Sequence, residues 1–432
     1  MCVIFSNLSS CDLYNTCHFL WLVIKYSGPR LYQNTSKIKC LRSNYVPCIL
    51  FLQNIQEFDN LKQDDPSKNH KIDDFSQFAT QSIHSGENLS TSAPPIYQAV
   101  TVDGVYLRSG NPTIDALETR ITALEGGTSS IATSSGTSAI SQTLTALLSA
   151  GDRIVCHKTI YAWTKVILDS YLAKFGVEVT YIDMRDLDQL RLALEMPTRL
   201  VYFEPITNPT VDVIDTEAVA RITKRSEAIV VVDNTYLTPY HLKPFNWGID
   251  IVIHSATKYL CGHGDALAGL IVCRTSEFAE RIAHVRNAYG GVLSPQNAFL
   301  TLRGIKTLPL RMKQHAANAQ QVAEYLEKHP KVSQVNYPGL KSNLGYKVAK
   351  RMIINGFGGM INFGLINPAE QERFLKRVQL CKPWVSLGDT QSLVTAENLG
   401  GLIPGGYDRI RMSVGLESID DIIADLKLAL GN

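Results

Sequence analysis

The sequence predicts an α/β protein with a mainly parallel central sheet, followed by a smaller C-terminal α+β domain. From about residue 130, short runs rich in β-branched residues alternate with amphipathic stretches such as Leu187–Leu194 and Thr216–Arg225. Strands that alternate with helices usually form a parallel sheet, with a ligand site at the carboxyl ends of the strands. After Arg303 the pattern changes to long helical stretches, which indicates a second packing unit. The expected strands of the large sheet are Arg153–Cys156, Glu178–Ile182, Leu200–Glu204, Ala228–Asp233, Asp250–His254 and Gly269–Cys273.

The C-terminal unit is expected to contain three helices and a short strand. The helices are Leu310–Lys328, Ala369–Val378 and Ile419–Leu430, and the strand is Gly358–Phe363. We therefore expect a large domain over residues 131–308 and a small domain over residues 309–432, preceded by an N-terminal arm over residues 76–130.

Residues 1–75 differ in character from the rest of the chain. They lack sustained periodicity and end in a polar stretch, Asp59–Asp74, that is typical of a linker. A secretory signal does not fit, because Lys25 and Tyr26 follow the apolar stretch where small cleavage-site residues belong. Asp12 is the one acidic residue before position 50, so an organellar transit peptide stays open as an alternative. We expect a disordered or dispensable extension.

Charge and hydropathy argue against nucleic acid and membrane as partners. The 432 residues include 42 Lys+Arg and 40 Asp+Glu, for a net charge of +2, which gives no basic footprint for DNA or RNA. The longest apolar runs, Phe19–Ile24 and Cys48–Leu52, are far shorter than the roughly 18–20 residues that span a bilayer. The nine cysteines form no CxxC pair, which indicates free thiols in a reducing compartment, by default the cytoplasm.

The common signatures of nucleotide and metal sites are missing from the sequence. Neither G-x-x-x-x-G-K-[ST] nor G-x-G-x-x-G occurs, so the α/β pattern does not indicate a P-loop or dinucleotide enzyme. Cys261, His263 and Asp265 lie close together, but in a glycine-containing stretch that is more typical of a loop than of a metal site. We expect no metal.

Three other features converge on one cofactor. The small-residue run Ser134–Ser138 precedes an apolar helical stripe, so it is either an ordinary helix cap or an anion site at a helix N-terminus. Asp233 ends a predicted strand, and Lys258 follows the next strand beside the hydroxyls of Ser255 and Thr257. Taken singly, Asp233 could be a helix cap and Lys258 a solvated surface lysine. Together they match pyridoxal phosphate, which needs a phosphate site, a carboxylate for its ring nitrogen and an amine for its aldehyde.

The chain from about Phe78 to Leu430 resembles the trans-sulfuration enzymes of Cys/Met metabolism, a fold-type-I pyridoxal-phosphate family. The resemblance rests on separate motifs in a fixed order. These are Tyr106–Thr113, Thr207–Thr210, Val232–Thr235, Ser255–Tyr259, Leu302–Leu308 and Arg411–Glu417.

The resemblance implies roles for residues around the cofactor ring. Lys258 would bind the aldehyde covalently and carry protons, and Asp233 would keep the ring nitrogen protonated. Asn208 would donate a hydrogen bond to the phenolic oxygen. Tyr161 would stack on the ring and shuttle protons.

The resemblance also implies phosphate and substrate contacts. Gly136 and Thr137, through backbone amides, and Ser255 and Thr257, through hydroxyls, would bind the phosphate. Arg411 would bind the substrate α-carboxylate, with Ser386 nearby. Tyr106 and Arg108 would reach the phosphate of a neighbouring subunit, so the N-terminal arm completes another copy's site. This implies a homo-oligomer, at least a dimer and usually a tetramer in the family.

The implied activity is that of a lyase or transferase acting on a sulfur-containing L-amino acid. The leading hypothesis is γ-elimination from methionine, homocysteine or cystathionine, which gives a 2-oxo acid and ammonia. The alternatives are γ-replacement on an O-acylhomoserine and, more remotely, a non-catalytic regulatory protein on the same fold. Val385 stands where enzymes acting on cystathionine at the γ-carbon usually have Glu, and its surroundings look more like a methionine γ-lyase. Trp163 stands where methionine γ-lyases usually have Cys, and the stretch 394–406 departs from the family pattern, so the substrate stays open.

Overall fold

The computed structural model describes residues 76–87, 91–367, 370–397 and 409–431. The predicted extension over residues 1–75 lies outside the described residues, as does most of the stretch 394–406 from position 398 onward. The domain boundaries expected above therefore stay predictions.

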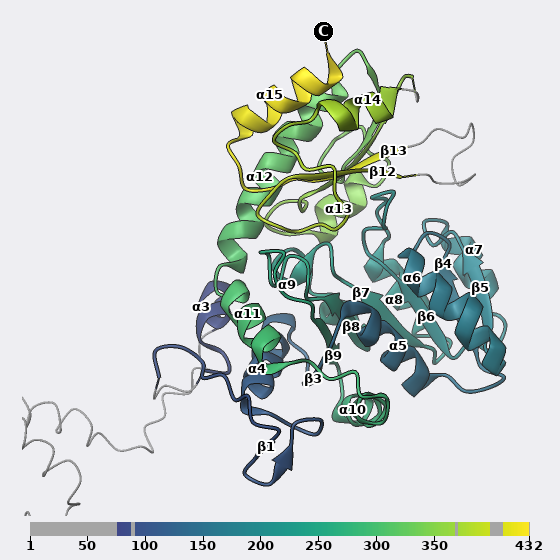
Figure 1. The fold of residues 1–432 in the computed structure, drawn as a ribbon. Helices are drawn as coiled ribbons and strands as arrows, with labels where there is room; N and C mark the ends of the chain where they lie inside the picture. The colour runs from purple at the N-terminus through teal and green to yellow at the C-terminus, as the bar shows by residue number, and fades with distance from the viewer. Residues whose placement is uncertain (1–75, 88–90, 368–369, 398–408, 432) are drawn as a thin grey trace, which may run out of the picture. The chain divides into compact units, whose positions relative to one another are not determined.

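A seven-stranded sheet forms the centre of the structure, with the strand order β3-β9-β8-β7-β6-β4-β5 (Figure 1). The pairs from β8 through β7, β6 and β4 to β5 are parallel, whereas β9 runs antiparallel to both β8 and β3. The predicted mainly parallel sheet is thus confirmed. The strands are β3 Ser129–Thr133, β4 Arg153–His157, β5 Glu178–Ile182, β6 Leu200–Phe203, β7 Ile229–Asp233, β8 Ile251–Ser255 and β9 Gly269–Cys273. β3, the edge strand, was not among those predicted.

Helices bury both faces of this sheet. Successive strand residues point to opposite faces, so Val155 of β4 joins one apolar cluster while Ile154 joins the other. Central parallel strands are covered on both sides, which is why they read as continuous apolar runs. The helices around the sheet are α4 Pro112–Glu125, α5 Gly136–Leu147, α6 Ala162–Val166, α7 Leu187–Ala193, α8 Thr216–Thr223, α9 Thr238–His241, α10 Ser276–Tyr289 and α11 Pro295–Ile305.

The C-terminal part contains a four-stranded antiparallel sheet with the order β10-β11-β13-β12. One face packs against helices through residues such as Phe363 and Met412. The alternate residues, among them Asn362 and Arg411, lie on the other face. The elements are β10 Val332–Asn336, β11 Met360–Leu365, β12 Leu393–Glu397 and β13 Arg409–Ser413, with α12 Leu308–Glu327, α13 Tyr346–Met352, α14 Glu370–Arg377 and α15 Ile419–Leu430. α15 has the predicted bounds, and β11 begins two residues later than predicted.

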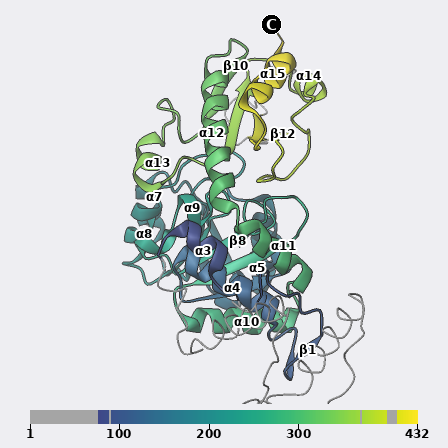
Figure 2. The same ribbon diagram turned by 90° about the vertical axis from the view of Figure 1, so that its left-hand side faces the viewer.

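The long helix α12 runs from the large sheet's helices to the small sheet (Figure 2). It contacts α9 at one end and β10 and α15 further along. Its first turn holds Pro309, which suits that position because no intrahelical partner is needed for its missing N–H. The remaining elements are α3 Phe78–His84, the hairpin β1 Thr101–Val102 and β2 Val105–Tyr106, and the short turns η3 Ile167–Tyr171, η4 Leu172–Phe175 and η5 Pro244–Trp247. In the described part of the chain, every helix is too short or too polar to cross a bilayer.

Candidate active site

The carboxyl ends of β7 and β8 bring together predicted site residues. Asp233 ends β7 and is 9% exposed, and β8 pairs with β7 in parallel and ends at Ser255. Thr235 joins the two strand ends, because its N–H and hydroxyl donate to Asp233 Oδ1 and its oxygen accepts the Ser255 N–H at 2.8 Å. The structure brings Asp233 and Ser255 together at the carboxyl ends of neighbouring strands, and their role in binding a ligand stays a prediction.

Burial sets the protonation chemistry of this edge. Desolvation raises the pKa of the Asp233 carboxyl, and the hydrogen bonds from Thr235 partly offset that rise. A cation placed beside Asp233 would stabilise its ionised form, because opposite charges favour each other strongly in a poorly solvated site. A protonated pyridine nitrogen is such a cation.

The N-terminus of α5 lies against the end of β8. A Cβ added at Gly136 would come within 2.6 Å of the Ser255 Cβ, so glycine is required for this close approach. Ser135 caps the helix by accepting the Ser138 N–H at 3.0 Å. The N-terminal end of α5 therefore lies beside the Ser255 hydroxyl, an arrangement that suits a phosphate. Thr257 differs, because its hydroxyl already bonds the backbone of Ala268 at 3.2 and 3.0 Å.

Lys258 contacts a residue from the C-terminal part of the chain. Its Nζ donates to Ser386 Oγ at 2.8 Å. Desolvation lowers the pKa of the Lys258 ammonium, and the nearby Arg411 guanidinium lowers it further. Ser386 has a φ of +90°, a left-handed backbone conformation that residues other than glycine rarely adopt. Such backbone strain is found at functional sites, where surrounding contacts hold it in place.

Arg411 is held by two partners at the same junction. The side chain is buried, its Nη1 donates to Asn208 Oδ1 at 2.7 Å, and its Nε lies 3.2 Å from Glu397 Oε1. Burial raises the pKa of Glu397, whereas Arg411 lowers it. Glu397 belongs to the stretch that departs from the family pattern, and no motif of the sequence assigns it a role.

Glu204 is a second site residue that sequence reasoning missed. It follows β6 and is 5% exposed. Its Oε1 accepts the Tyr161 N–H at 2.7 Å and its Oε2 accepts the Asn208 N–H at 2.8 Å. One carboxylate thus fixes the backbone at both residues expected to contact the cofactor ring. Desolvation raises the pKa of Glu204, and the nearby Asp233 raises it further.

Tyr161 lies at the N-cap of α6, facing Thr137 of α5. Burial raises the pKa of its phenol, while the Thr137 side chain beside it lowers that pKa. Trp163, two residues further on, is 57% exposed, and Val385, next to Ser386, is 77% exposed. The two departures from the family pattern therefore flank residues of the site.

Tyr106 and Arg108 are not brought to this site by their own chain. The Arg108 guanidinium lies over the Tyr106 ring, 5.1 Å from its centroid, and both side chains are exposed. In the described residues no hydrogen bond joins them to the other predicted site residues. Their hairpin β1–β2 lies at the opposite end of the described chain from the small sheet (Figures 1 and 2).

The suggested metal ligands Cys261, His263 and Asp265 instead bond one another within a loop. Cys261 Sγ lies 3.3 Å from Asp265 Oδ1, and His263 Nδ1 lies 2.7 Å from the Cys261 carbonyl oxygen.

These residues suit pyridoxal phosphate in type and in place. A buried carboxylate, an amine with a lowered pKa, and a helix N-terminus that meets a hydroxyl match the ring nitrogen, aldehyde and phosphate of that cofactor. The fold and the site together define a pyridoxal-phosphate enzyme of the fold-type-I class.

Comparison with known proteins identifies the family. The family model described as Cys/Met metabolism PLP-dependent enzyme matches residues 70–431. The chain belongs to this family, and it is therefore a PLP-dependent enzyme of sulfur amino-acid metabolism.

Named relatives and solved structures agree with this assignment. An L-methionine gamma-lyase of Fusobacterium nucleatum is 42% identical over 82% of this chain and 98% of the relative. A cystathionine beta-lyase of Lactococcus lactis is 40% identical over 81% of this chain and 98% of its own length. The crystal structure of a cystathionine gamma-lyase of Lactobacillus plantarum, complexed with L-serine, matches with a TM-score of 0.77 and 39% identity, covering 82% of this chain and 98% of that one.

Proposed function

We propose that this enzyme is a carbon–sulfur lyase that performs γ-elimination on a sulfur-containing L-amino acid, releasing a 2-oxo acid and ammonia. The observation that carries the proposal is the meeting of Lys258, Ser386 and Arg411 at one junction, 2.8 Å separating Lys258 Nζ from Ser386 Oγ. An amine able to move a proton thus lies beside a guanidinium able to hold a carboxylate. Relatives named methionine and cystathionine lyases support the same reaction class.

Residues of the large sheet would hold the cofactor. Asp233 would face the ring nitrogen, Asn208 the phenolic oxygen and Tyr161 the ring face. The phosphate would lie between Ser255 and the N–H groups of Gly136 and Thr137, with Thr257 shaping the loop beside it. When bound, pyridoxal phosphate supplies an electron sink for the pair left at the substrate α-carbon.

Residues of the junction would handle the substrate. Arg411 would orient the amino acid by its α-carboxylate, since a guanidinium binds a carboxylate through two parallel hydrogen bonds. Lys258, with its pKa lowered by burial, would take the proton from the α-carbon, and Ser386 would fix the position of its Nζ. Tyr161 would stand at the face where a leaving thiolate needs a proton.

The test is a product assay with separate substrates. The purified holoenzyme would receive methionine, homocysteine, cystathionine, or O-acetyl- or O-succinyl-homoserine, each with and without an added thiol. A four-carbon 2-oxo acid and ammonia from a sulfur substrate, without added thiol, supports γ-elimination. A strict need for a thiol with the acyl-homoserines supports γ-replacement instead, and a three-carbon 2-oxo acid from cystathionine indicates β-elimination. Inertness towards every substrate, with cofactor bound, supports the regulatory alternative.

We also propose that the active enzyme is a homo-oligomer, at least a dimer and by family resemblance a tetramer. Tyr106 and Arg108 are exposed and remote from Lys258 in their own chain, which suits residues that serve another copy's phosphate. Mixing the inactive variants Lys258→Ala and Arg108→Ala, under conditions that exchange subunits, tests this directly. Shared sites predict recovered activity in mixed oligomers, whereas self-contained sites predict none.

We place the enzyme in the cytoplasm and retain the proposed large domain over residues 131–308 and small domain over residues 309–432. The cysteines Cys156, Cys261, Cys273 and Cys381 are buried and unpaired, as suits a reducing compartment. Fractionation of the host cell tests the location, and limited proteolysis tests the boundary near residue 308.

A further inference from the structure

The turn from Thr207 to Asp212 carries Asn208 and adopts a strained conformation. Val211 is fully buried with a φ of +60°, which is costly for a β-branched residue. Contacts within the turn support it, because the Val211 N–H donates to the Thr207 carbonyl at 2.8 Å and the Asp212 N–H donates to Thr207 Oγ1 at 2.9 Å. Strained backbone of this kind persists only when surrounding structure holds it firmly.

Three side chains of the small sheet form a row that faces this turn. Asn336 of β10 lies directly opposite Asn362 of β11, and Asn362 lies directly opposite Arg411 of β13. Cross-strand partners share a face of the sheet, so the three side chains point the same way. Their neighbours Phe363 and Met412 point to the opposite face, where they pack against the helices.

Each member of the row donates to a different, successive residue of the turn. Asn336 Nδ2 donates to the Thr210 carbonyl at 2.5 Å, and Asn362 Nδ2 donates to the Pro209 carbonyl at 3.0 Å. Arg411 Nη1 donates to the side chain of Asn208 at 2.7 Å. The three donors thus tie the turn to β10, β11 and β13, and Arg411 belongs to the last of these strands.

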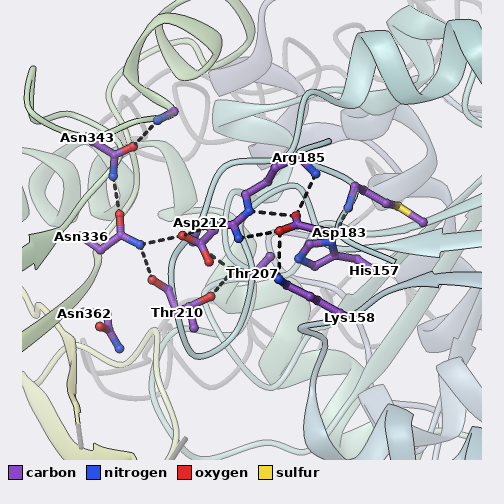
Figure 3. Close-up of polar contacts among 12 residues, drawn as sticks. His157, Lys158, Asp183, Arg185, Thr207, Thr210, Asp212, Asn336, Asn343 and Asn362 are labelled. Carbon is purple, nitrogen blue, oxygen red and sulfur yellow. Dashed lines mark hydrogen bonds and ion pairs between the residues drawn. The ribbon is translucent and has the colours of Figure 1, made fainter. Parts of the chain in front are cut away.

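The donors are themselves held in place. Asn362 is 1% exposed, and its Oδ1 accepts the Arg409 Nε–H at 2.9 Å, so both ends of its amide are bonded. Asn336 Nδ2 also lies 3.1 Å from Asp212 Oδ1, and its own Oδ1 accepts from Asn343 (Figure 3).

The large domain holds the same turn from the other side. Arg185, which follows β5, lies 3.2 Å from Asp212 Oδ1 and 2.7 Å from Asp183 Oδ2, and Asp183 in turn pairs with Lys158 at 2.9 Å. Figure 3 shows Asp212 between Asn336 on one side and Arg185 on the other. The turn is therefore tied to both sheets at once.

We propose that Asn336 and Asn362 are positioning residues that act through the Thr207–Asp212 turn. They hold Asn208 at the cofactor ring oxygen and, through Asn208, hold Arg411 in register for the substrate carboxylate. This inference rests on the proposed function of the site. If Asn336 and Asn362 act in this way, the packing of the small sheet on the turn determines both the geometry of the cofactor contacts and the affinity for the substrate.

The test compares Asn362→Ala and Asn336→Ala with a matched control, Asn318→Ala. Asn318 is also 1% exposed and also donates to backbone carbonyls, those of Gly415 at 3.0 Å and Glu417 at 2.9 Å, but it does not touch the turn. All three variants lose hydrogen bonds to buried or partly buried carbonyls, so similar losses of thermal stability are expected. Asn336 is less buried than Asn362, so its variant covers the case in which Asn362→Ala does not fold.

Two measurements separate positioning from a purely structural role. The visible circular dichroism of the bound cofactor, recorded without substrate, is expected to change in Asn362→Ala and Asn336→Ala and to match the wild-type spectrum in Asn318→Ala. KM for the amino acid is expected to rise about tenfold in the first two variants, with a smaller change in kcat, and to stay near the wild-type value in the control.

Spectra and KM values in the two row variants that equal those of Asn318→Ala would overturn the positioning role while leaving the proposed function intact. A wild-type chain that gains no visible band with pyridoxal phosphate would overturn both.

Discussion

The two halves of the active site are built in different ways. The cofactor half, at the ends of β7 and β8 and the start of α5, consists of residues that follow directly from regular elements, such as Asp233 and Gly136. The substrate half gathers Ser386, Arg411 and Glu397 from a loop and from two strands of another sheet. The strand-end and helix-start part of the cofactor half thus follows from secondary structure, whereas Asn208 and the substrate half depend on how two sheets meet.

The halves also differ in charge. The cofactor half holds two buried acids, Glu204 and Asp233; desolvation raises the pKa of both, and Asp233 raises that of Glu204 further. The junction holds the cations Lys258 and Arg411, with Glu397 beside Arg411. The two buried acids therefore lie in the cofactor half and the two cations at the junction. Substitutions in the two halves should produce losses of activity that can be distinguished from one another.

The largest effect is expected at Lys258. Lys258→Ala should lose covalent attachment of the cofactor and roughly a thousandfold or more in kcat, because nucleophile and proton carrier are removed together. The absorbance of the reconstituted protein and a 2-oxo acid assay measure both losses. Ser386→Ala, which removes only the partner of Nζ, should keep the attachment. An unchanged visible band in Lys258→Ala would contradict the assignment of this residue.

The stability of the protein at acid pH tests two buried histidines, one in the large sheet and one in helix α12. Desolvation lowers the pKa of His157 in β4 and of His315 in α12 to about 4 in each case, from an ordinary value of 6.5. At these two positions the unfolded chain therefore binds more protons than the folded chain between pH 6.5 and 4, so their contribution to stability is fully present above pH 6.5 and is lost as the pH drops through that window. Each histidine accounts for at most roughly 3 kcal/mol of that loss.

Thermal unfolding at several pH values checks this expectation. His157→Asn and His315→Asn should each be less stable at neutral pH and should each show a shallower pH dependence. Buried carboxyls such as Glu118, whose pKa is raised to about 7, contribute with the opposite sign in this window, so each variant is compared with the wild-type protein. A pH dependence in a variant that equals the wild-type dependence would contradict a buried neutral histidine at that position.

Glu204 tests the rigidity of the cofactor half. Glu204→Gln keeps one acceptor but turns an amide N–H₂ towards a backbone N–H, so either Tyr161 or Asn208 loses its partner. We expect about a hundredfold loss in kcat/KM, since an unsatisfied buried donor costs on the order of 1–3 kcal/mol. Steady-state kinetics and equilibrium dialysis of the cofactor measure the effect. Wild-type values for both would mean that other contacts hold these two backbones.

Glu397 tests the substrate half and should have the smallest effect, with the opposite sign. Its ion pair with Arg411 must open or rearrange when a substrate carboxylate binds, so Glu397→Gln should lower KM by about fivefold, or about 1 kcal/mol for a partly exposed pair. Raising the ionic strength should narrow the difference between the wild-type enzyme and the variant. If KM rises in Glu397→Gln, Glu397 orients Arg411 for the substrate rather than competing with it.

Much of the cofactor half could be predicted from the sequence. The β-branched run Ile229–Val232 specifies a buried strand, and a residue that directly follows such a strand must lie at the ligand edge of a parallel sheet. Asp233 and Ser255 accordingly lie at the ends of neighbouring strands, as this reasoning predicts. Glu204 ends the predicted strand Leu200–Glu204, and this position could have identified it, but nothing local indicates that its carboxylate accepts two distant N–H groups.

The row of hydrogen-bond donors on the small sheet is less clearly indicated by the sequence than the cofactor half is. Polar residues alternate with apolar ones through Asn362 and Phe363 and through Arg411 and Met412, which marks one polar face. The alternation does not say what that face meets. It also does not give the register that aligns Asn336, Asn362 and Arg411, because register depends on strand pairing across the whole sheet.

The sequence by itself determined six of the seven strands of the large sheet, its mainly parallel character and the pairing of a strand-end aspartate with a lysine after the next strand. These features depend on local periodicity and on which residues end each element. Only the tertiary structure decided that Arg411 meets Asn208, 203 residues away, that Ser386 bonds Lys258 from 128 residues away, and that Glu397 pairs with Arg411. Contacts over such separations follow from the packing of one sheet on another, and no short window of sequence encodes that packing.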